Sequence, residues 1–421
     1  MANIQPFRAI RPSPDKVHLV ASRSYITYSK KDLRSKLDEN PYTFLHILNP
    51  EYKSKERTPP LSTARFTKIR DNFQAFLKQD ILQEDSTAGF YVYRQIKDGH
   101  PYLGIIACAS VDDYHRQIIK KHEATIAQRE ETFKNYLHTV KINAEPVCLS
   151  YPNHPTIDQL TKKYCRERAV YDFTTTNKVR HTLWVIESKE DIKQIHAAFA
   201  EIPSIYIADG HHRSASSALL GKELQQSNPT HSGKEGYNFF MAYLIPESNL
   251  QIFSYNRLIR GIEAINPEKL IGKIKQKFQL IPLEEDTFIP SKKHEIGMYL
   301  NRKWYCLVPK KELYQEEDTV GKLDVSILSK SVLKPIFGIT DLRTDKRIYF
   351  KGGADGVLSL MEEVDQGKAQ IAFAHFPLSV EDLRSIADEN KIMPPKSTWI
   401  EPKLRSGLTV YDINQEHALY E

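Results

Sequence analysis

The sequence contains few cysteines and no pattern that would pair them. The four cysteines form no CxxC motif, which argues against a structural zinc site and against a disulfide framework. The chain has no run of about 18 apolar residues, and its first residues lack the apolar stretch of a signal peptide. We therefore expect a protein of the reducing cytoplasm that is neither exported nor membrane-spanning. The cysteines are Cys108, Cys148, Cys165 and Cys306.

Long basic segments and familiar nucleotide-binding motifs are also lacking. The net charge is only +6 for 59 basic and 53 acidic residues, without the basic arm that coats nucleic acid. We expect no nucleic-acid partner, whereas an anionic small molecule fits this charge balance. The absence of a GxxxxGK[ST] loop and of the protein-kinase motif set excludes those two classes of phosphate-transferring enzyme.

Length and residue patterning predict two domains. At 421 residues the chain exceeds what one hydrophobic core usually organises. Strand-like and helix-like stretches alternate through residue 226, which predicts a mixed α/β domain with an N-terminal extension over 1–262. A smaller α+β domain is expected over 263–421. We expect helices at 66–80, 112–138, 192–201 and 323–337, strands at 89–95, 102–110, 182–188 and 204–210, and two further strands within 237–260.

The stretch IYIADGHHR places an acid, a glycine and three basic side chains where a strand is expected to lead into a helix. The start of a helix binds phosphate through backbone N–H groups and the helix dipole, and Gly210 allows close approach or a positive φ. Arg213 could add a planar fork for an anion, and His211 and His212 could exchange protons near neutral pH. Asp209 would repel an anion unless Mg²⁺ lies between the carboxylate and a phosphate.

A simpler interpretation stays open at this corner. Asp209 could cap the helix, Arg213 could pair with a surface acid, and the histidines could pack locally. A zinc site is disfavoured because adjacent histidines point in different directions, unlike a pair at i and i+4 of a helix. Five such residues together at the end of a buried strand favour a ligand site.

Two further segments carry candidate residues. If KKHEATIAQRE is helical, Glu123 and Glu130 share one helix face; the alternative is a solvated face with local charge pairs. Near the C-terminus, two prolines in MPPKSTWIEPKLRSG leave Lys396, Ser397 and Thr398 as donors on an irregular loop. By itself, that loop is equally well interpreted as a polar surface turn.

Three strings in this order, HEATIAQRE, ADGHHRSA and PPKSTWIEPKL, resemble the free-serine kinases called SerK and a related large family of unknown function. Both belong to the ParB/sulfiredoxin-like superfamily. The resemblance to the family of unknown function runs nearly end to end and includes FLHILNPE, YVYRQ, LDVSIL and SGL. It implies a ParB/sulfiredoxin-like N-terminal domain, with the active site in the cleft between that domain and the C-terminal one.

Carried over position by position, the resemblance implies a role for each candidate residue. Glu123 would be the general base for a substrate hydroxyl, with Asp209 and His211 as the other catalytic groups and Asp209 as the magnesium ligand. The phosphoryl donor would be bound by Gly210, His212, Arg213 and Lys396, and the substrate by Glu130, Ser397 and Thr398.

The implied activity is phosphorylation of free L-serine to O-phosphoserine by a monomer or homodimer, with pyrophosphate, ADP or ATP as donor. Two alternatives stay open: a phosphoserine phosphatase that uses the same residues, and a ParB-like nucleotide- or nucleic-acid-binding regulator. Two departures from the family patterns bear on this. The SerK loop continues with Arg and His where this chain has Trp399 and Ile400, and SRSYITY stands where the related family has PPYDV.

Overall fold

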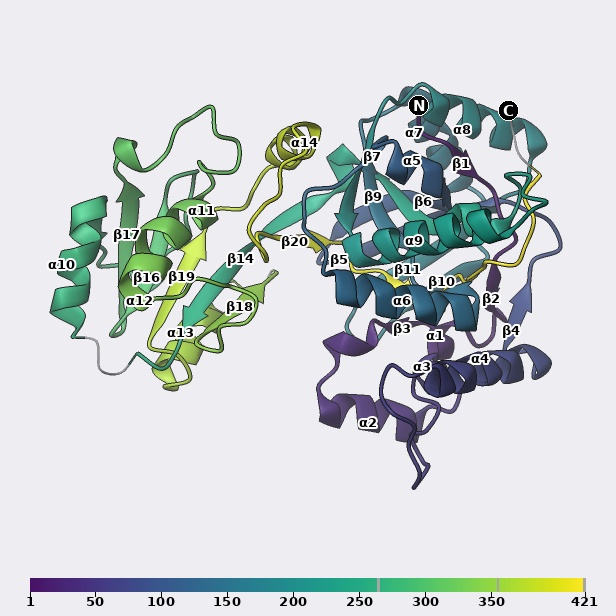
Figure 1. Cartoon of the computed structure of the whole chain (residues 1–421), viewed down its shortest axis with the longest axis horizontal. Coiled ribbons are helices and arrows are strands. Elements are labelled where there is room, and N and C mark those ends of the chain that lie inside the picture. The colour runs from purple at the N-terminus through teal and green to yellow at the C-terminus, as the bar shows by residue number, and fades with distance from the viewer. Residues whose placement is uncertain (263–265, 354–355, 419–421) are drawn as a thin grey trace. The chain divides into compact units, whose positions relative to one another are not determined.

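The computed structural model describes residues 1–262, 266–353 and 356–418. The chain is a mixed α/β protein with several sheets, and its contacts divide it into two compact units (Figure 1). The first unit comprises Met1–Lys121, Thr125–Leu250 and Pro402–Glu421, and the second comprises His122–Ala124 and Gln251–Glu401.

The sequence predicted a domain boundary near residue 262, with everything after it in the second domain. The structure assigns the C-terminal segment differently. Residues from Pro402 onward pack with the first unit rather than the second. The backbone of Val410 exchanges two hydrogen bonds with Ile10, and the Tyr411 hydroxyl donates to the Gly236 carbonyl over 2.8 Å. The Val410 side chain of this segment is buried in the same apolar cluster as Ile10 and Phe44.

The first unit is built around one large mixed sheet. Most neighbouring strands are antiparallel, but β13 pairs parallel with β9, and β12 pairs parallel with β7. In spatial order the strands are β10 (Tyr171–Thr174), β11 (Arg180–Ile186), β5 (Phe90–Lys97), β6 (His100–Ser110), β13 (Phe239–Pro246), β9 (Val147–Tyr151), β12 (Ile205–Asp209) and β7 (Ile119–Lys120), with β1 (Ile4–Gln5) also on β6.

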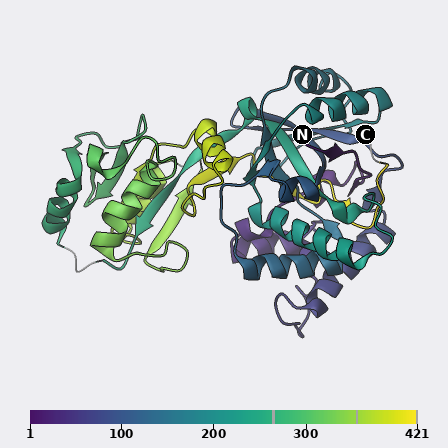
Figure 2. The ribbon, with the colours of Figure 1, turned by 45° about the horizontal axis from the view of Figure 1, so that its top comes forward.

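Helices α7 and α8 lie together on the same side of this sheet (Figures 1 and 2). Their apolar residues Ile157 and Ile195 join Ile105 and Trp184 of the strands in the main buried core, which is the largest source of stability in a domain of this kind. Helix α9 packs against α5 and α6. The bounds are α5 (Val111–His115), α6 (Ala127–Val140), α7 (Pro155–Tyr164), α8 (Lys189–Ala200) and α9 (His211–Ser227).

The N-terminal section forms a smaller core of its own around Phe44, Phe66 and Phe73. The helix expected at 66–80 is present as α4, and Ser62 caps it by accepting a hydrogen bond from the Arg65 backbone. The elements here are β2 (Ile10–Pro12), α1 (Val17–Val20), β3 (Ser22–Arg23), α2 (Lys30–Glu39), α3 (Leu45–Leu48), α4 (Thr63–Lys78) and β4 (Leu82–Glu84), and the short strands β8 (Ile142–Asn143), β21 (Arg405–Ser406) and β22 (Tyr411–Asp412) complete the unit.

One expected helix, 112–138, is not continuous. The chain leaves α5 through Gln117, which has a φ of 59°, and then forms β7, whose Ile119 and Lys120 pair with β12. Ile119 is fully buried in the main core, so pairing at the sheet edge stabilises it more than another helical turn would. Glu123 therefore does not share a helix face with Glu130, which lies in the first turn of α6.

The second unit is an antiparallel sheet with helices on both faces. Its strands in spatial order are β15 (Phe278–Pro282), β17 (Lys303–Pro309), β16 (Ile296–Leu300), β19 (Ile371–His375), β14 (Gln251–Ile259) and β18 (Ile348–Gly352), with β20 (Thr398–Glu401) on β14. The sequence predicted that the strand at Gln251–Ile259, β14, ends the first domain. The strands that pair with β14 all belong to the second unit.

Two apolar clusters hold helices against this sheet. On one face Ile274 and Val332 pack on Ile259 and Phe373, and on the other Leu360 packs on Leu258. No helix among the described residues is both long enough and apolar enough to cross a membrane. The helices are α10 (Pro267–Lys277), α11 (Asp324–Leu328), one turn of π-helix (Ser329–Leu333), α12 (Lys334–Phe337), α13 (Leu358–Asp365) and α14 (Val380–Asp388).

Candidate functional site

The strand-to-helix corner expected from the sequence is present in the first unit. Strand β12 ends at Asp209, and the ladder with β9 shifts register between Ile207 and Asp209. Gly210 follows with a φ of 104°, a backbone conformation that side chains rarely adopt, and α9 begins at His211. The glycine therefore lets the chain reverse within one residue, so that the Asp209 carboxylate lies beside the first turn of α9.

Two acid–base pairs surround this corner. Arg213 folds back over Gly210 and forms an ion pair with Glu145, whose other oxygen accepts a hydrogen bond from the Ser406 hydroxyl over 2.9 Å. The Lys403 ammonium lies 3.3 Å from Asp209 Oδ2. Acidic and basic side chains therefore balance around the corner, and each cation already has a carboxylate partner.

The charges keep the Asp209 carboxylate ionised. Burial acts to raise the pKa of this carboxyl, but Lys403 and Arg213 outweigh it and hold that pKa below its ordinary value. Burial likewise acts to lower the pKa of the Arg213 guanidinium, but Glu145 and Asp209 raise it. The Asp209 side chain as a whole is nevertheless 43% exposed, so it is open to solvent.

His211 does not behave as the sequence suggested. Its side chain is buried, and burial, together with the nearby charges of His212 and Lys121, lowers its pKa to about 3 even though Asp209 opposes the shift. The imidazole is neutral at physiological pH and does not titrate near neutrality. It can accept a hydrogen bond or a ligand at one nitrogen, but it is not a general acid at pH 7.

Cys148 lies opposite Asp209 in the β9–β12 ladder. The thiol is completely buried, and burial and the neighbouring Asp209 charge raise its pKa to about 12. A thiolate is the reactive form of cysteine, so this side chain is inert at neutral pH.

Two residues of the corner were missed by sequence reasoning. Lys403 is part of the string PPKSTWIEPKL, in which the sequence pattern indicated Lys396, seven residues earlier. Glu145 follows α6 and β8 and precedes β9, and nothing in its neighbourhood marks it as functional. Glu145 and Lys403 reach the corner through contacts between segments that are distant in the chain. In one of these contacts the Gly407 backbone N–H donates to the Ala144 carbonyl over 2.9 Å.

The remaining candidates fall into both units. Glu130 lies with the corner in the first unit, and Glu123 lies in the short irregular segment assigned to the second unit, where the Met393 backbone N–H donates to the His122 carbonyl over 2.9 Å. Lys396, Ser397 and Thr398 also belong to the second unit. The structure thus brings Asp209–Arg213 together, while the roles of all these residues stay predictions.

The loop that carries Lys396 is strained. Lys396 adopts a φ of 59°, and its ammonium lies 5.2 Å from the centre of the Tyr255 ring. Such a left-handed conformation in a non-glycine residue is uncommon and clusters at functional sites. Ser397 is buried, and its hydroxyl donates to the Pro394 carbonyl over 2.6 Å, so it shapes this loop directly.

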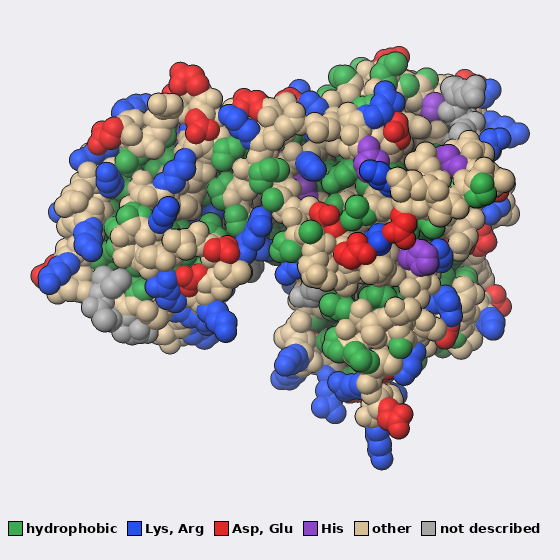
Figure 3. All heavy atoms as spheres, in the orientation of Figure 1, with side chains coloured by type: hydrophobic (Ala, Val, Ile, Leu, Met, Phe, Trp, Pro, Cys, Tyr) green, Lys and Arg blue, Asp and Glu red, His purple; other side chains and the backbone are tan. Residues whose placement is uncertain are grey.

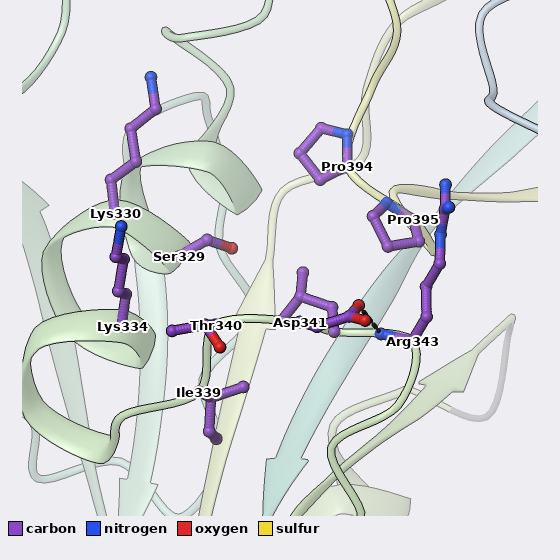
Figure 4. A pocket seen from close by; sticks show the side chains of 10 residues that line it. Ser329, Lys330, Lys334, Ile339, Thr340, Asp341, Arg343, Pro394 and Pro395 are labelled. Atoms are coloured by element: carbon purple, nitrogen blue, oxygen red, sulfur yellow. Dashed lines mark hydrogen bonds between the residues drawn. The ribbon is translucent and has the colours of Figure 1, made fainter.

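The second unit also contains a recess of about 370 Å³. Lys330 and Lys334 extend from the helix on one side, and Arg343 lies on the other, next to Pro395 (Figure 4). On the face of the molecule in Figure 3, lysine and arginine side chains are interspersed with acidic ones. Asp341 also lines the recess, next to Arg343, so the lining carries both signs of charge.

Fold and site together define a mixed α/β protein of two units with a charged strand–glycine–helix corner in the first unit. Residues 4–326 match the family described as "Protein of unknown function (DUF1015)", and the chain belongs to this family. No curated protein matches the chain.

Several solved structures are similar at low identity. SbnI with a C-terminal truncation, from Staphylococcus aureus, shares 13% identity over 72% of this chain and 87% of that chain, with a TM-score of 0.38. A free serine kinase in complex with AMP shares 12% over 73% and 91%, with a TM-score of 0.35. A conserved hypothetical protein from Pyrococcus furiosus shares 13% over 74% and 97%, also with a TM-score of 0.35.

Proposed function

We propose that the protein is a phosphotransferase that moves a phosphoryl group from pyrophosphate, ADP or ATP to the hydroxyl of free L-serine, using Mg²⁺. The proposal also assigns its first unit to the ParB/sulfiredoxin-like superfamily. The observation that carries it is the corner at Asp209–Arg213, where an ionised, partly exposed carboxylate lies next to a helix start and two cations. The resemblance of the three sequence strings supplies the acceptor.

The residues of the corner fit a magnesium ion and a phosphate. Mg²⁺ binds through one or two carboxylates together with substrate phosphates, and Asp209 is such a carboxylate. When bound, the ion would neutralise charge on the donor phosphates. The first turn of α9 and the Arg213 guanidinium would hold phosphoryl oxygens through directed N–H groups.

Lys403 has a defined part in this scheme. Its ammonium lies 3.3 Å from Asp209, where it balances the carboxylate charge. A bound cation competes with that ammonium, because both are attracted to the same oxygens. Lys403 would then be released to contact the phosphoryl group, so that the corner exchanges one internal ion pair for contacts with the donor.

Phosphoryl transfer to an alcohol also requires a base for the hydroxyl proton and exclusion of water. Glu123 is the base in this proposal, and general bases of this kind contribute about 10²–10⁴-fold to a rate. The proposal requires Glu123 to reach the serine hydroxyl at the corner. The strained Lys396 loop would restrain the donor and limit its hydrolysis.

The test is an initial-rate assay of L-serine with each of pyrophosphate, ADP and ATP, with Mg²⁺ or with a chelator, in which phosphoserine formed over time is measured by mass spectrometry. Glu123→Gln should lower turnover by at least about 10²-fold, and Asp209→Asn should abolish the magnesium-dependent activity. Glu131→Gln on α6, which removes an exposed acid paired with Lys134, is the matched control and should retain full activity.

Other outcomes would change the assignment. No phosphoserine with any donor refutes the kinase proposal. Consumption of added phosphoserine, with the same dependence on Asp209, would instead support the phosphatase. Activity that survives chelation would show that Asp209 does not hold a metal.

A further inference from the structure

The second unit contains a buried arginine with no acidic partner among the residues that the structure describes. Arg257 of β14 is completely inaccessible to solvent, and its guanidinium donates through Nη1 to the Tyr255 carbonyl over 2.5 Å. Within the described part of the chain, its Nε and Nη2 have no hydrogen-bond partner and no carboxylate forms an ion pair with it. The flat side chain lies 5.6 Å from the centre of the Phe350 ring.

A second unsatisfied group lies on the same face of the same sheet. Arg257 pairs with Phe373 in the β14–β19 ladder, and His375 follows two residues later, so its side chain points to the same side. His375 is 3% exposed, and neither of its ring nitrogens has a partner among the described residues. Burial and the Arg257 charge hold its pKa well below the ordinary value, so the ring is neutral and offers one N–H donor.

The sheet opens where these two side chains lie. The β14–β19 ladder stops at Arg257 and Phe373, and the His375 backbone N–H donates instead to the Asn256 side chain over 3.0 Å. Beyond that point, the residues Gln251–Ser254 pair with β20. The two strands therefore separate next to the unsatisfied donors, instead of closing over them with regular backbone pairing.

An oxyanion explains all three features. A buried charge without a counter-charge is strongly destabilising, and a buried donor without an acceptor calls for a bound ion or water. Burial lowers the pKa of the Arg257 guanidinium to about 9, so the group is still charged at neutral pH. Carboxylate and phosphoryl oxygens match the planar fork of arginine, with which they form two parallel hydrogen bonds.

We propose that Arg257 and His375 form a binding site for a small oxyanion, a carboxylate or a phosphoryl group, in the second unit. Arg257 supplies the charge and two donors, and His375 supplies a third donor from the neighbouring strand. Both residues belong to the second unit, and the inference does not depend on the kinase proposal.

The test uses the full chain carrying Arg213→Ala, because the Asp209–Arg213 corner is itself a candidate for phosphate. Inorganic phosphate and acetate are the probes, and calorimetric titration and the thermal midpoint are the readouts. Adding Arg257→Met should weaken binding of the preferred anion by about tenfold or more, because a charge-assisted pair of hydrogen bonds is lost. Adding Arg260→Met should leave binding unchanged, since Arg260 follows the end of β14, is exposed and donates to the Lys346 carbonyl.

The comparison separates a ligand site from a purely structural arginine. Methionine removes an uncompensated buried charge, so Arg257→Met should raise the thermal midpoint without anion and reduce the rise that the anion induces. His375→Phe is the second variant should Arg257→Met not fold, and it should also weaken binding. Preference for phosphate or for acetate identifies the group that binds. An undiminished anion response in both variants, or no response to either probe in the Arg213→Ala chain, overturns the proposal.

Discussion

Replacement of Gly210 by alanine tests how the corner is held. Gly210 has a φ of 104°, and an added Cβ would lie 3.0 Å from both Nε and Nη2 of Arg213. A positive φ destabilises the folded state of an L-residue by about 1–2 kcal/mol. Alanine also restricts the unfolded chain, which offsets about 0.4–1 kcal/mol of that loss in the free energy of unfolding. Displacing Arg213 from the partly exposed Glu145 adds about 1 kcal/mol. We expect a total loss of about 2 kcal/mol.

Gly99→Ala is the matched control. Gly99 has a φ of 78° in the hairpin between β5 and β6, and nothing lies within 4 Å of its would-be Cβ. It therefore reports backbone strain alone, a loss of about 1 kcal/mol in urea unfolding. Only Gly210→Ala should also weaken phosphate binding. If both variants lose the same stability and bind phosphate alike, Arg213 is not held over Gly210 in the way described.

Three other substitutions test neighbouring features. Lys403→Met should tighten Mg²⁺ binding measured by calorimetry, because the ammonium no longer competes for Asp209, and should change the unfolding free energy by less than about 1 kcal/mol for this exposed pair; weaker Mg²⁺ binding would contradict the competition. The Lys68 ammonium is the main cause that lowers the pKa of the Glu51 carboxyl to about 2, from 4.5 for an ordinary glutamate. The ionised carboxylate therefore stabilises the folded chain above pH 4.5, and this contribution disappears as the pH falls towards 2. Thermal melts should show Glu51→Gln less stable than the native chain at pH 7, with a difference that shrinks below pH 4.5; a constant difference would contradict this origin. Gly407→Ala, at a φ of 76° and with a Cβ that would overlap the Phe44 ring, should loosen the C-terminal segment and speed its removal by limited proteolysis; unchanged proteolysis would contradict the tethering role of this turn.

Features set by adjacent residues were predictable from the sequence. The turn KDGH became a two-residue hairpin in which Asp98 and Gly99 both have positive φ, the conformation that Asp-Gly favours. The corner at Gly210 was equally local, because a strand, a glycine and a run of helix formers specify it without help from distant segments.

Features decided by distant segments were not predictable. Apolar spacing over 112–138 suits a helix, yet Ile119 and Lys120 pair with β12, which lies some eighty residues away in the chain. The adjacent residues also do not indicate that Glu123 lies outside a helix, or that the chain returns to the first unit at Pro402. Intrinsic helix preference is a weak effect that burial of one side chain such as Ile119 can override.

The same limit explains why the corner looked more basic from the sequence than it is. Arg213 and two histidines near Asp209 suggest a positively charged site when only adjacent residues are considered. In the folded chain Arg213 is paired with Glu145, Asp209 is paired with Lys403, and His211 is neutral. An anion must therefore compete with two carboxylates for these cations. Under the proposed function, a Mg²⁺ ion held by Asp209 would free Lys403 for the anion, so the Lys403–Asp209 pair that the sequence did not reveal bears directly on the proposed role of the metal.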